Sequence, residues 1–206
     1  MTDISNHLNG PKPKAVLQTS INRQLGDPGP LNFSMIERAI AEGIPEDDQL
    51  DWKRDLPSDG TEFAKDVAAF ANSRGGVIVY GVSEDRKTSR AQSAALVDIS
   101  EASQRRLRSW VGTRVSPLLG TFSLTPLPAP GDPSTGFLVV WVGESPDAPH
   151  MIGNDERLGC PYRLHAQTVW MREWDISRAY QERFARRVTD PESADSVGVS
   201  GWRMLL

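Results

Sequence analysis

The chain has 206 residues but a single cysteine, Cys160, and only three histidines. One cysteine cannot form an internal disulfide, and His7, His150 and His165 do not complete a zinc-ligand spacing with it. These shortages exclude disulfide-stapled secreted domains and structural zinc modules. Neither His150 nor His165 has a serine or cysteine nearby in a nucleophile-elbow motif, so the sequence gives no support to a hydrolase triad.

Long apolar runs are absent as well. The longest, Val77–Tyr80 and Phe137–Val142, are far shorter than the ~20 residues that a membrane-spanning helix needs. The first residues, MTDISNHLNGPKPK, contain no apolar segment of the kind found in secretory signals. We therefore expect no membrane span and no secretion signal, and we predict a cytoplasmic protein.

Charge is unevenly distributed along the chain, although the net charge is only −4. Residues 46–66 hold eight acids and three bases, whereas residues 101–187 hold eleven arginines, nine acids and no lysine. Arginine is suited to forked contacts with phosphate. The net charge argues against a uniformly basic nucleic-acid binder, but the segregation leaves room for a local phosphate-binding surface.

The ends of the chain differ in composition from its middle. Residues 1–30 contain four prolines and little apolar periodicity, which predicts a flexible leader. Residues 189–206 are polar apart from a short apolar end, which predicts a disordered tail. The folded domain is therefore expected over residues 31–188.

The first half of this domain predicts helices that alternate with strands. We expect a helix capped by Asn32, a short strand over residues 50–53, a helix that follows Asp59, a strand over residues 77–82, and a helix over residues 101–111. The second helix carries a continuous apolar stripe and ends at a Gly-Gly turn, and the strand after it is apolar on both faces. This unit indicates a mixed β-sheet flanked by helices, an α/β (α+β) fold.

The second half is richer in strand signals. Residues 83–90 read as a polar turn, and residues 121–127 and 137–142 read as a hairpin with a long irregular loop. Weaker strands are expected at 162–164 and 168–171, and Asp175 is expected to cap a last helix.

The segment that joins the second helix to the buried strand, Asn72-Ser73-Arg74-Gly75-Gly76, has two interpretations. The glycines permit a sharp turn, and Asn72 can hydrogen-bond at the helix end. Alternatively, Asn72, Gly75 and Gly76 form a bare backbone turn that a phosphate can approach. The turn is not a P-loop, because G-x-x-x-x-G-K-[ST] is absent and the glycines follow a helix, so Walker-type ATP binding is not expected.

The stretch from Glu46 to Asp85, with LDWKRDL and EFAKDVAAFANSRGGVIVYGVSED, closely resembles the Schlafen AlbA-like domain. The resemblance continues more loosely through FLVVWVGESPDAPH and YRLHAQTVWMREWDISRAYQERF and covers about two-thirds of the chain. It implies a mixed sheet flanked by helices and a nucleic-acid-binding role, toward DNA or RNA. In vertebrate Schlafen proteins the domain forms a metal-dependent RNA-cleaving core.

The resemblance also implies a site for Mg²⁺ or Mn²⁺. The positions that match the family's three carboxylates are Glu46, Asp51 and Glu84, although Asp85 is an alternative to Glu84. Hard divalent cations prefer such oxygen ligands, and Lys53, two residues from Asp51 on the same strand face, is placed to meet a phosphate. The alternative interpretation is a solvated acidic surface without catalytic function.

Arginines on two predicted helices carry the binding hypothesis. The first group is Arg105, Arg106, Arg108 and Arg114, and the second is Arg183, Arg186 and Arg187. They are expected to contact phosphates with salt-sensitive, largely sequence-independent affinity, unless they form an ordinary solvated helix surface. Trp110, Trp170 and Trp174 could stack on bases if they are exposed.

These observations favour a stand-alone nucleic-acid-binding domain. The first alternative is a divalent-metal-dependent endoribonuclease that uses Glu46, Asp51 and Glu84. The second is a protein-interaction or assembly module, in which the apolar end Trp202–Leu206 docks onto a protein partner or a second copy.

Overall fold

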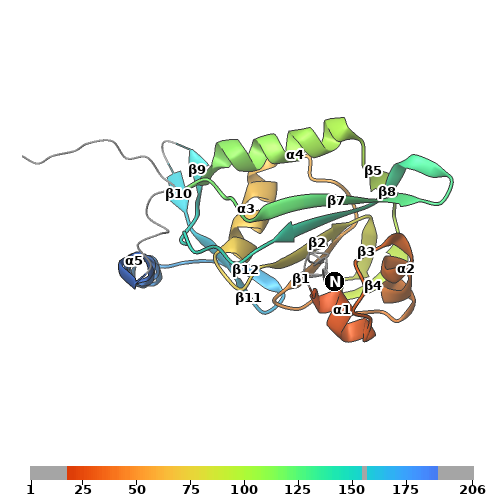
Figure 1. The fold of residues 1–206 in the computed structure, drawn as a ribbon, viewed down its shortest axis with the longest axis horizontal. Coiled ribbons are helices and arrows are strands. Elements are labelled where there is room, and N and C mark those ends of the chain that lie inside the picture. Colours follow the sequence, from red (N-terminus) through yellow and green to blue (C-terminus); the bar gives the residue numbers. More distant parts are fainter. Residues whose placement is uncertain (1–17, 155–156, 190–206) are drawn as a thin grey trace, which may run out of the picture.

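A five-stranded mixed β-sheet forms the centre of the molecule (Figure 1). The structure, a computed structural model, describes residues 18–154 and 157–189. The sheet contains β1 (Leu50–Lys53), β2 (Gly76–Tyr80), β5 (Val97–Asp98), β7 (Phe122–Ala129) and β8 (Asp132–Val142). β1 pairs with β2 in parallel, and β8 pairs antiparallel with β2, β5 and β7. The predicted α+β fold is therefore confirmed.

Helices cover both faces of this sheet. α3 (Gly60–Ala71) and α4 (Glu101–Arg114) pack on one face, and α1 (Ser20–Leu25) and α2 (Phe33–Ala41) pack on the other. The sheet serves both layers because neighbouring side chains of a strand point to opposite faces. In β2, Ile78 and Tyr80 join the α3 side, whereas Val77 and Val79 join the α1–α2 side.

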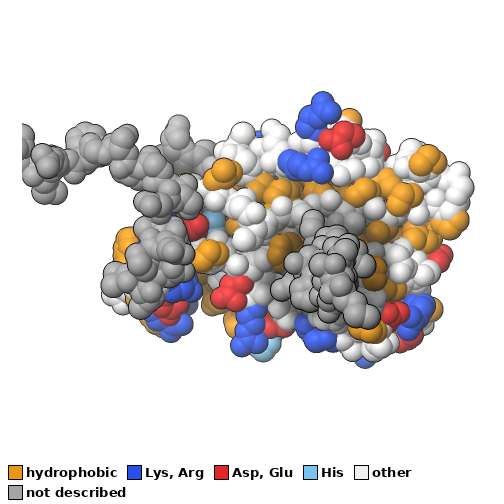
Figure 2. All heavy atoms as spheres, viewed as in Figure 1, with side chains coloured by type: hydrophobic (Ala, Val, Ile, Leu, Met, Phe, Trp, Pro, Cys, Tyr) orange, Lys and Arg blue, Asp and Glu red, His pale blue; other side chains and the backbone are white. Residues whose placement is uncertain are grey.

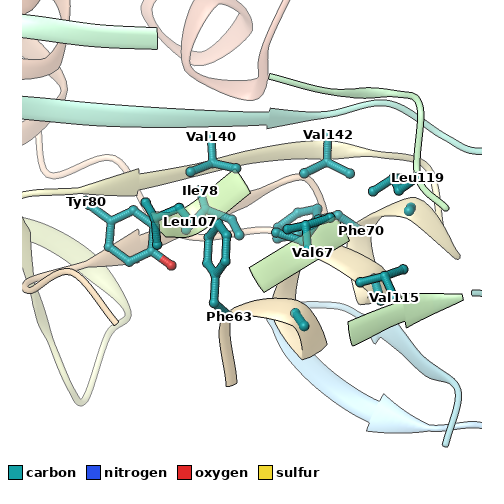
Figure 3. Close-up of a cluster of buried hydrophobic side chains, with 14 of the residues drawn as sticks. Phe63, Val67, Phe70, Ile78, Tyr80, Leu107, Val115, Leu119, Val140 and Val142 are labelled. Atoms are coloured by element: carbon teal, nitrogen blue, oxygen red, sulfur yellow. The ribbon is translucent and has the colours of Figure 1, made fainter. Parts of the chain in front are cut away.

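The larger core lies under α3. Figure 3 shows Phe63, Val67 and Phe70 of α3 gathered around Ile78 and Val140 of the sheet. All five side chains are fully buried. Burial of a large apolar side chain contributes about 1.5–3 kcal/mol relative to exposure, so this cluster fixes α3 firmly against the sheet.

Smaller sheets complete the fold around this centre. β3 (Val82–Asp85) pairs with β4 (Arg90–Ala94), and β11 (Pro161–Leu164) pairs with β12 (Gln167–Trp170). A third sheet joins β6 (Val115–Ser116), β9 (Met151–Asn154) and β10 (Arg157–Gly159). The last helix, α5 (Glu173–Thr189), lies at the end of the molecule away from α1 and α2 (Figure 1).

The predicted helices after Asn32, Asp59 and Ser100 are confirmed, and each of these residues caps its helix. The leader prediction is wrong for residues 20–25, because these form α1. Its six residues are held by a reciprocal cap between Thr19 and Asn22 and by complete burial of Ile21. The domain boundaries themselves stay predictions, and residues 190–206 lie outside the described residues.

Three further predictions need correction. The polar stretch 83–90 contains most of β3 and the first residue of β4, with the turn between them. The expected long loop at 128–136 is a tight turn, because Gly131 adopts φ +84° and lets β7 and β8 extend almost to each other. α5 begins at Glu173, and Asp175 accepts the Arg172 N–H from inside its first turn. Within the described part of the chain, no helix has the length and apolarity to cross a membrane.

Candidate functional site

The acids predicted from the family resemblance lie around β1. Asp51 is 3% exposed and lies beside Ile78 in the ladder, on the face that α3 covers. Lys53 lies two residues further on the same face, and its Nζ is 2.9 Å from Asp51 Oδ1 and 2.7 Å from Oδ2. Burial favours the neutral amine, but the charge of Asp51 and its hydrogen bond outweigh burial and raise the pKa of Lys53. Asp51 and Lys53 thus form a partly buried ion pair.

Glu46 joins this pair from the loop before β1. Its Oε1 accepts the backbone N–H of Trp52 at 2.7 Å. Burial, followed by a side-chain hydrogen bond with Asp51 and by the charge of Asp51, raises the pKa of Glu46 to about 9. Burial and the neighbouring Asp51 therefore favour the neutral form of Glu46, while the ammonium group of Lys53 lies against Asp51.

Asp66 of α3 is a member of this cluster that the sequence reasoning missed. Burial, and then the charge of Asp51, raises the pKa of Asp66 to about 6, while Lys53 acts in the opposite direction. A signal was present in the sequence, because Asp66 is three residues after Phe63 and four before Phe70. This spacing places an acid on the apolar face of the helix.

The third predicted carboxylate, Glu84, does not contact the others. It lies in β3 after a register shift between Ser83 and Glu84. Its charge makes the smallest of the contributions that shift the pKa of Glu46. The alternative, Asp85, closes its own turn by accepting the N–H groups of Lys87 and Thr88. These hydrogen bonds lower the pKa of Asp85.

The described residues do not fit a metal ion held by three carboxylates. Across residues 18–154 and 157–189, no three Asp, Glu, His or Cys side chains come together in a way that could hold one. The ammonium group of Lys53 already lies against both oxygens of Asp51. The chain itself supplies the cation that balances this carboxylate.

The first arginine group lies along α4, which crosses the top of the molecule in Figure 1. Arg105, Arg106 and Arg108 are exposed, and Arg114 at the helix end is half-buried. The guanidinium of Arg106 lies 5.3 Å from the centre of the Trp110 ring, which packs partly buried on the core. Three exposed arginines therefore share one helix.

The second arginine group lies on α5, at the end of the molecule away from α1 and α2 (Figure 1). Arg183 is half-buried and lies over the Tyr180 ring at 5.7 Å, and Arg187 forms an ion pair with Asp147 at 2.9 Å. Arg186 is exposed. The two groups therefore lie on separate helices, and Arg187 of the second group is already paired with an acid.

The turn that follows α3 is occupied by tertiary contacts. Asn72 Nδ2 donates to the carbonyls of His150 and Pro161, both at 2.8 Å, and Oδ1 accepts the His150 N–H at 2.6 Å. Gly75 has φ +69°, and a Cβ there would lie 2.6 Å from the Val142 carbonyl oxygen. At Gly76 a Cβ would lie 2.4 Å from the Gln49 carbonyl oxygen. These contacts support the structural interpretation of the turn over direct phosphate binding by Asn72, Gly75 and Gly76.

The tryptophans and the chain end complete the survey of predicted residues. Trp170 and Trp174 are 52% and 57% exposed. The apolar end Trp202–Leu206, predicted to dock onto a protein partner or a second copy, lies outside the described residues.

Comparison with known proteins identifies the domain. The sequence model of the family described as Schlafen, AlbA_2 matches residues 46–179. No curated protein matches. The structure is similar to the DIP2311 protein from Corynebacterium diphtheriae, with 17% identity and a TM-score of 0.43, over 66% of this chain and 29% of that one. The match to residues 46–179 covers more than half of the chain and includes β1, α3 and β2, and the chain therefore belongs to the Schlafen AlbA_2 family.

Proposed function

We propose that this domain binds nucleic acid and that the outward face of α4 contacts its phosphates. Membership of the Schlafen AlbA_2 family supports a nucleic-acid-related role. The observation that carries the choice of surface is the exposure of Arg105, Arg106 and Arg108 within two turns of one helix. An exposed arginine keeps its fork of N–H donors available for phosphate oxygens.

The surroundings of these arginines favour an anionic partner. Over its 14 residues α4 carries four arginines and one acid, Glu101. Arg108 lies 3.4 Å from Glu101 and also donates to Gln104, so only one of the arginines is partly neutralised within the helix. A binding mode of this kind positions a strand by its backbone and reads little sequence, for DNA and RNA alike.

Charge reversal on α4 tests the proposal. We expect the purified domain to retard single-stranded and structured nucleic acid at low salt, and the triple variant R105E/R106E/R108E to retard it at least about tenfold more weakly. The matched control R54E/R86E/K87E makes the same change of charge on exposed residues outside α4. Equal losses in both variants would show a general charge effect and contradict the α4 surface.

A metal-dependent endoribonuclease is the second candidate. The observation that favours it is the clustering of Glu46, Asp51, Lys53 and Asp66, since perturbed pKa values gather at functional sites. The lack of a third metal ligand in the described residues ranks it below binding. If the domain is such a nuclease, it should cleave RNA in the presence of Mg²⁺ or Mn²⁺, and Asp51→Asn should abolish the cleavage. Cleavage that persists in Asp51→Asn would exclude it.

A further inference from the structure

A groove separate from α4 lies between the end of α3 and the β11–β12 hairpin. Its volume is about 470 Å³, which falls within the range of small-ligand sites. The residues that give it its chemical character are Asp48, Ser73, Arg74, Tyr162, Arg163 and His165. Figure 2 shows a histidine beside Lys or Arg side chains along the lower edge of the molecule, where Figure 1 draws β11 and β12.

Arg163 provides a fixed positive charge at this groove. It is 8% exposed and has no carboxylate partner in the described part of the chain, a rare combination for an arginine. Its guanidinium lies 4.7 Å from the centre of the Phe70 ring and donates to the Asp47 carbonyl oxygen at 3.2 Å. Among the described residues its Nε–H has no acceptor. A buried cation with a spare donor is costly unless an anion completes its surroundings.

Arg74 lies at the rim of the same groove and, unlike the buried Arg163, is exposed to solvent. Its side chain is 80% exposed and is 3.8 Å from Asp48, a distance at which exposed pairs contribute little. Arg74 also lines a second hollow of about 180 Å³, together with Arg23 and Trp141. Arg74 is thus common to the two hollows, and within the second one Gln49 accepts from Arg23 at 2.8 Å and donates to the Arg74 carbonyl at 3.2 Å.

The charges around these hollows sum to an excess of cations. Arg23, Arg74 and Arg163 follow one another through the two hollows, against Asp48 in the first and Glu144 in the second. Asp47, whose carbonyl meets Arg163, directs its carboxylate to Ser20 and Gln24 instead. Ser73 adds a hydroxyl, whose oxygen accepts the backbone N–H of Arg163 at 2.8 Å.

We propose that this groove binds a phosphate group, with Arg74 in direct contact and Arg163 as the fixed charge beside it. The choice of phosphate rests on the proposed function, whereas the groove and its arginines do not depend on α4. The ligand is either a phosphate monoester, as in a nucleotide or a strand end, or a backbone diester. Tyr162 borders the groove and offers a ring on which a neighbouring base can stack.

The test compares three probes: AMP, a 5′-phosphorylated single-stranded RNA, and the same RNA with a 5′-hydroxyl. Binding is measured by titration calorimetry for AMP and by fluorescence anisotropy for the RNAs, with wild type, Arg74→Gln and the control Arg54→Gln. The Arg54 side chain is 71% exposed, and among the described residues the one acid paired with it is Asp55, at 4.0 Å. Arg163→Lys keeps the buried charge but loses the fork, and far-ultraviolet circular dichroism verifies that each variant is folded.

A monoester site predicts that AMP binds and that Arg74→Gln weakens AMP and 5′-phosphorylated RNA about fivefold or more, with Arg54→Gln unchanged. A diester site predicts that Arg74→Gln weakens both RNAs equally. If folded Arg74→Gln and Arg163→Lys both retain wild-type affinity for AMP and for the two RNAs, the proposal that the groove binds phosphate is wrong. That result leaves the α4 surface intact, since R105E/R106E/R108E tests it separately.

Discussion

Replacement of Asn72 tests the interpretation that the turn after α3 is structural. The Asn72 side chain makes three hydrogen bonds, to the carbonyls of His150 and Pro161 and from the His150 N–H. Asn72→Ala removes all three and leaves three part-buried backbone groups without partners. At about 1 kcal/mol for each, the expected loss is about 3 kcal/mol in the free energy of unfolding. For a domain of this size the loss corresponds to a decrease in Tm of roughly 6–12 °C.

Asn32→Ala is the matched control for this prediction. Asn32 caps α2 and receives one backbone hydrogen bond, from the Met35 N–H at 3.0 Å. Its loss is expected to cost about 1 kcal/mol. Urea denaturation of wild type and both variants measures the difference. If Asn72→Ala costs no more than Asn32→Ala, the three hydrogen bonds of Asn72 do not hold the turn in place. If a folded Asn72→Ala domain loses nucleic-acid affinity, the phosphate-binding interpretation of Asn72 is favoured instead.

Four other substitutions, two of them a matched pair of glycines, probe the fold and the buried cluster. Gly75→Ala should lower the free energy of unfolding by several kcal/mol, because φ is +69° and the added Cβ would meet a carbonyl oxygen. Gly131→Ala is the control: φ is +84° but the space is open, so it should cost only about 1–2 kcal/mol. Equal losses of both variants in urea denaturation would contradict the close approach at Gly75. Because the pKa of Asp66 is raised from 3.8 to about 6, folding favours its protonated form, so stability from this group is greatest below pH 4 and is lost as the pH rises through 6. Asp66→Asn should therefore raise the free energy of unfolding more at pH 8 than at pH 4, and a pH-independent difference would refute this. Ile21→Ala should cost about 2–4 kcal/mol if α1 belongs to the domain, and a neutral effect on Tm would restore the flexible leader.

Periodicity predicted the centre of the fold well, because local and tertiary preferences agree there. α3 has an apolar stripe, a capping residue and a Gly-Gly exit, and all three point to the same helix. α1 was missed since a six-residue helix gains little from its own sequence and depends on the burial of Ile21 by other elements. The strands β3 and β4 were missed since most of their residues are exposed or only half-buried and give no apolar alternation.

The candidate sites were predictable to a smaller extent. The family resemblance grouped Glu46, Asp51 and Glu84, and strand spacing put Lys53 on the face of Asp51. The structure brings Glu46 and Lys53 to Asp51 but leaves Glu84 apart. The sequence could not show that Lys53 neutralises Asp51. Strand spacing indicates that the two residues share a face of the sheet, but it does not give the direction in which the flexible lysine side chain points. Arg163 was overlooked because an arginine in a short strand carries no sign of burial, which here depends on Phe70, 93 positions earlier in the chain.

The salt dependence of nucleic-acid binding tests the central claim most directly. Each phosphate contact contributes about 0.7 to the slope of log K against log salt for a single strand. The neutral variant R105Q/R106Q/R108Q should therefore lower the magnitude of that slope by about 2 relative to wild type. The control R54Q/R86Q/K87Q should leave it unchanged. An unaltered slope in the α4 variant, with the domain folded, would contradict phosphate contact by this helix.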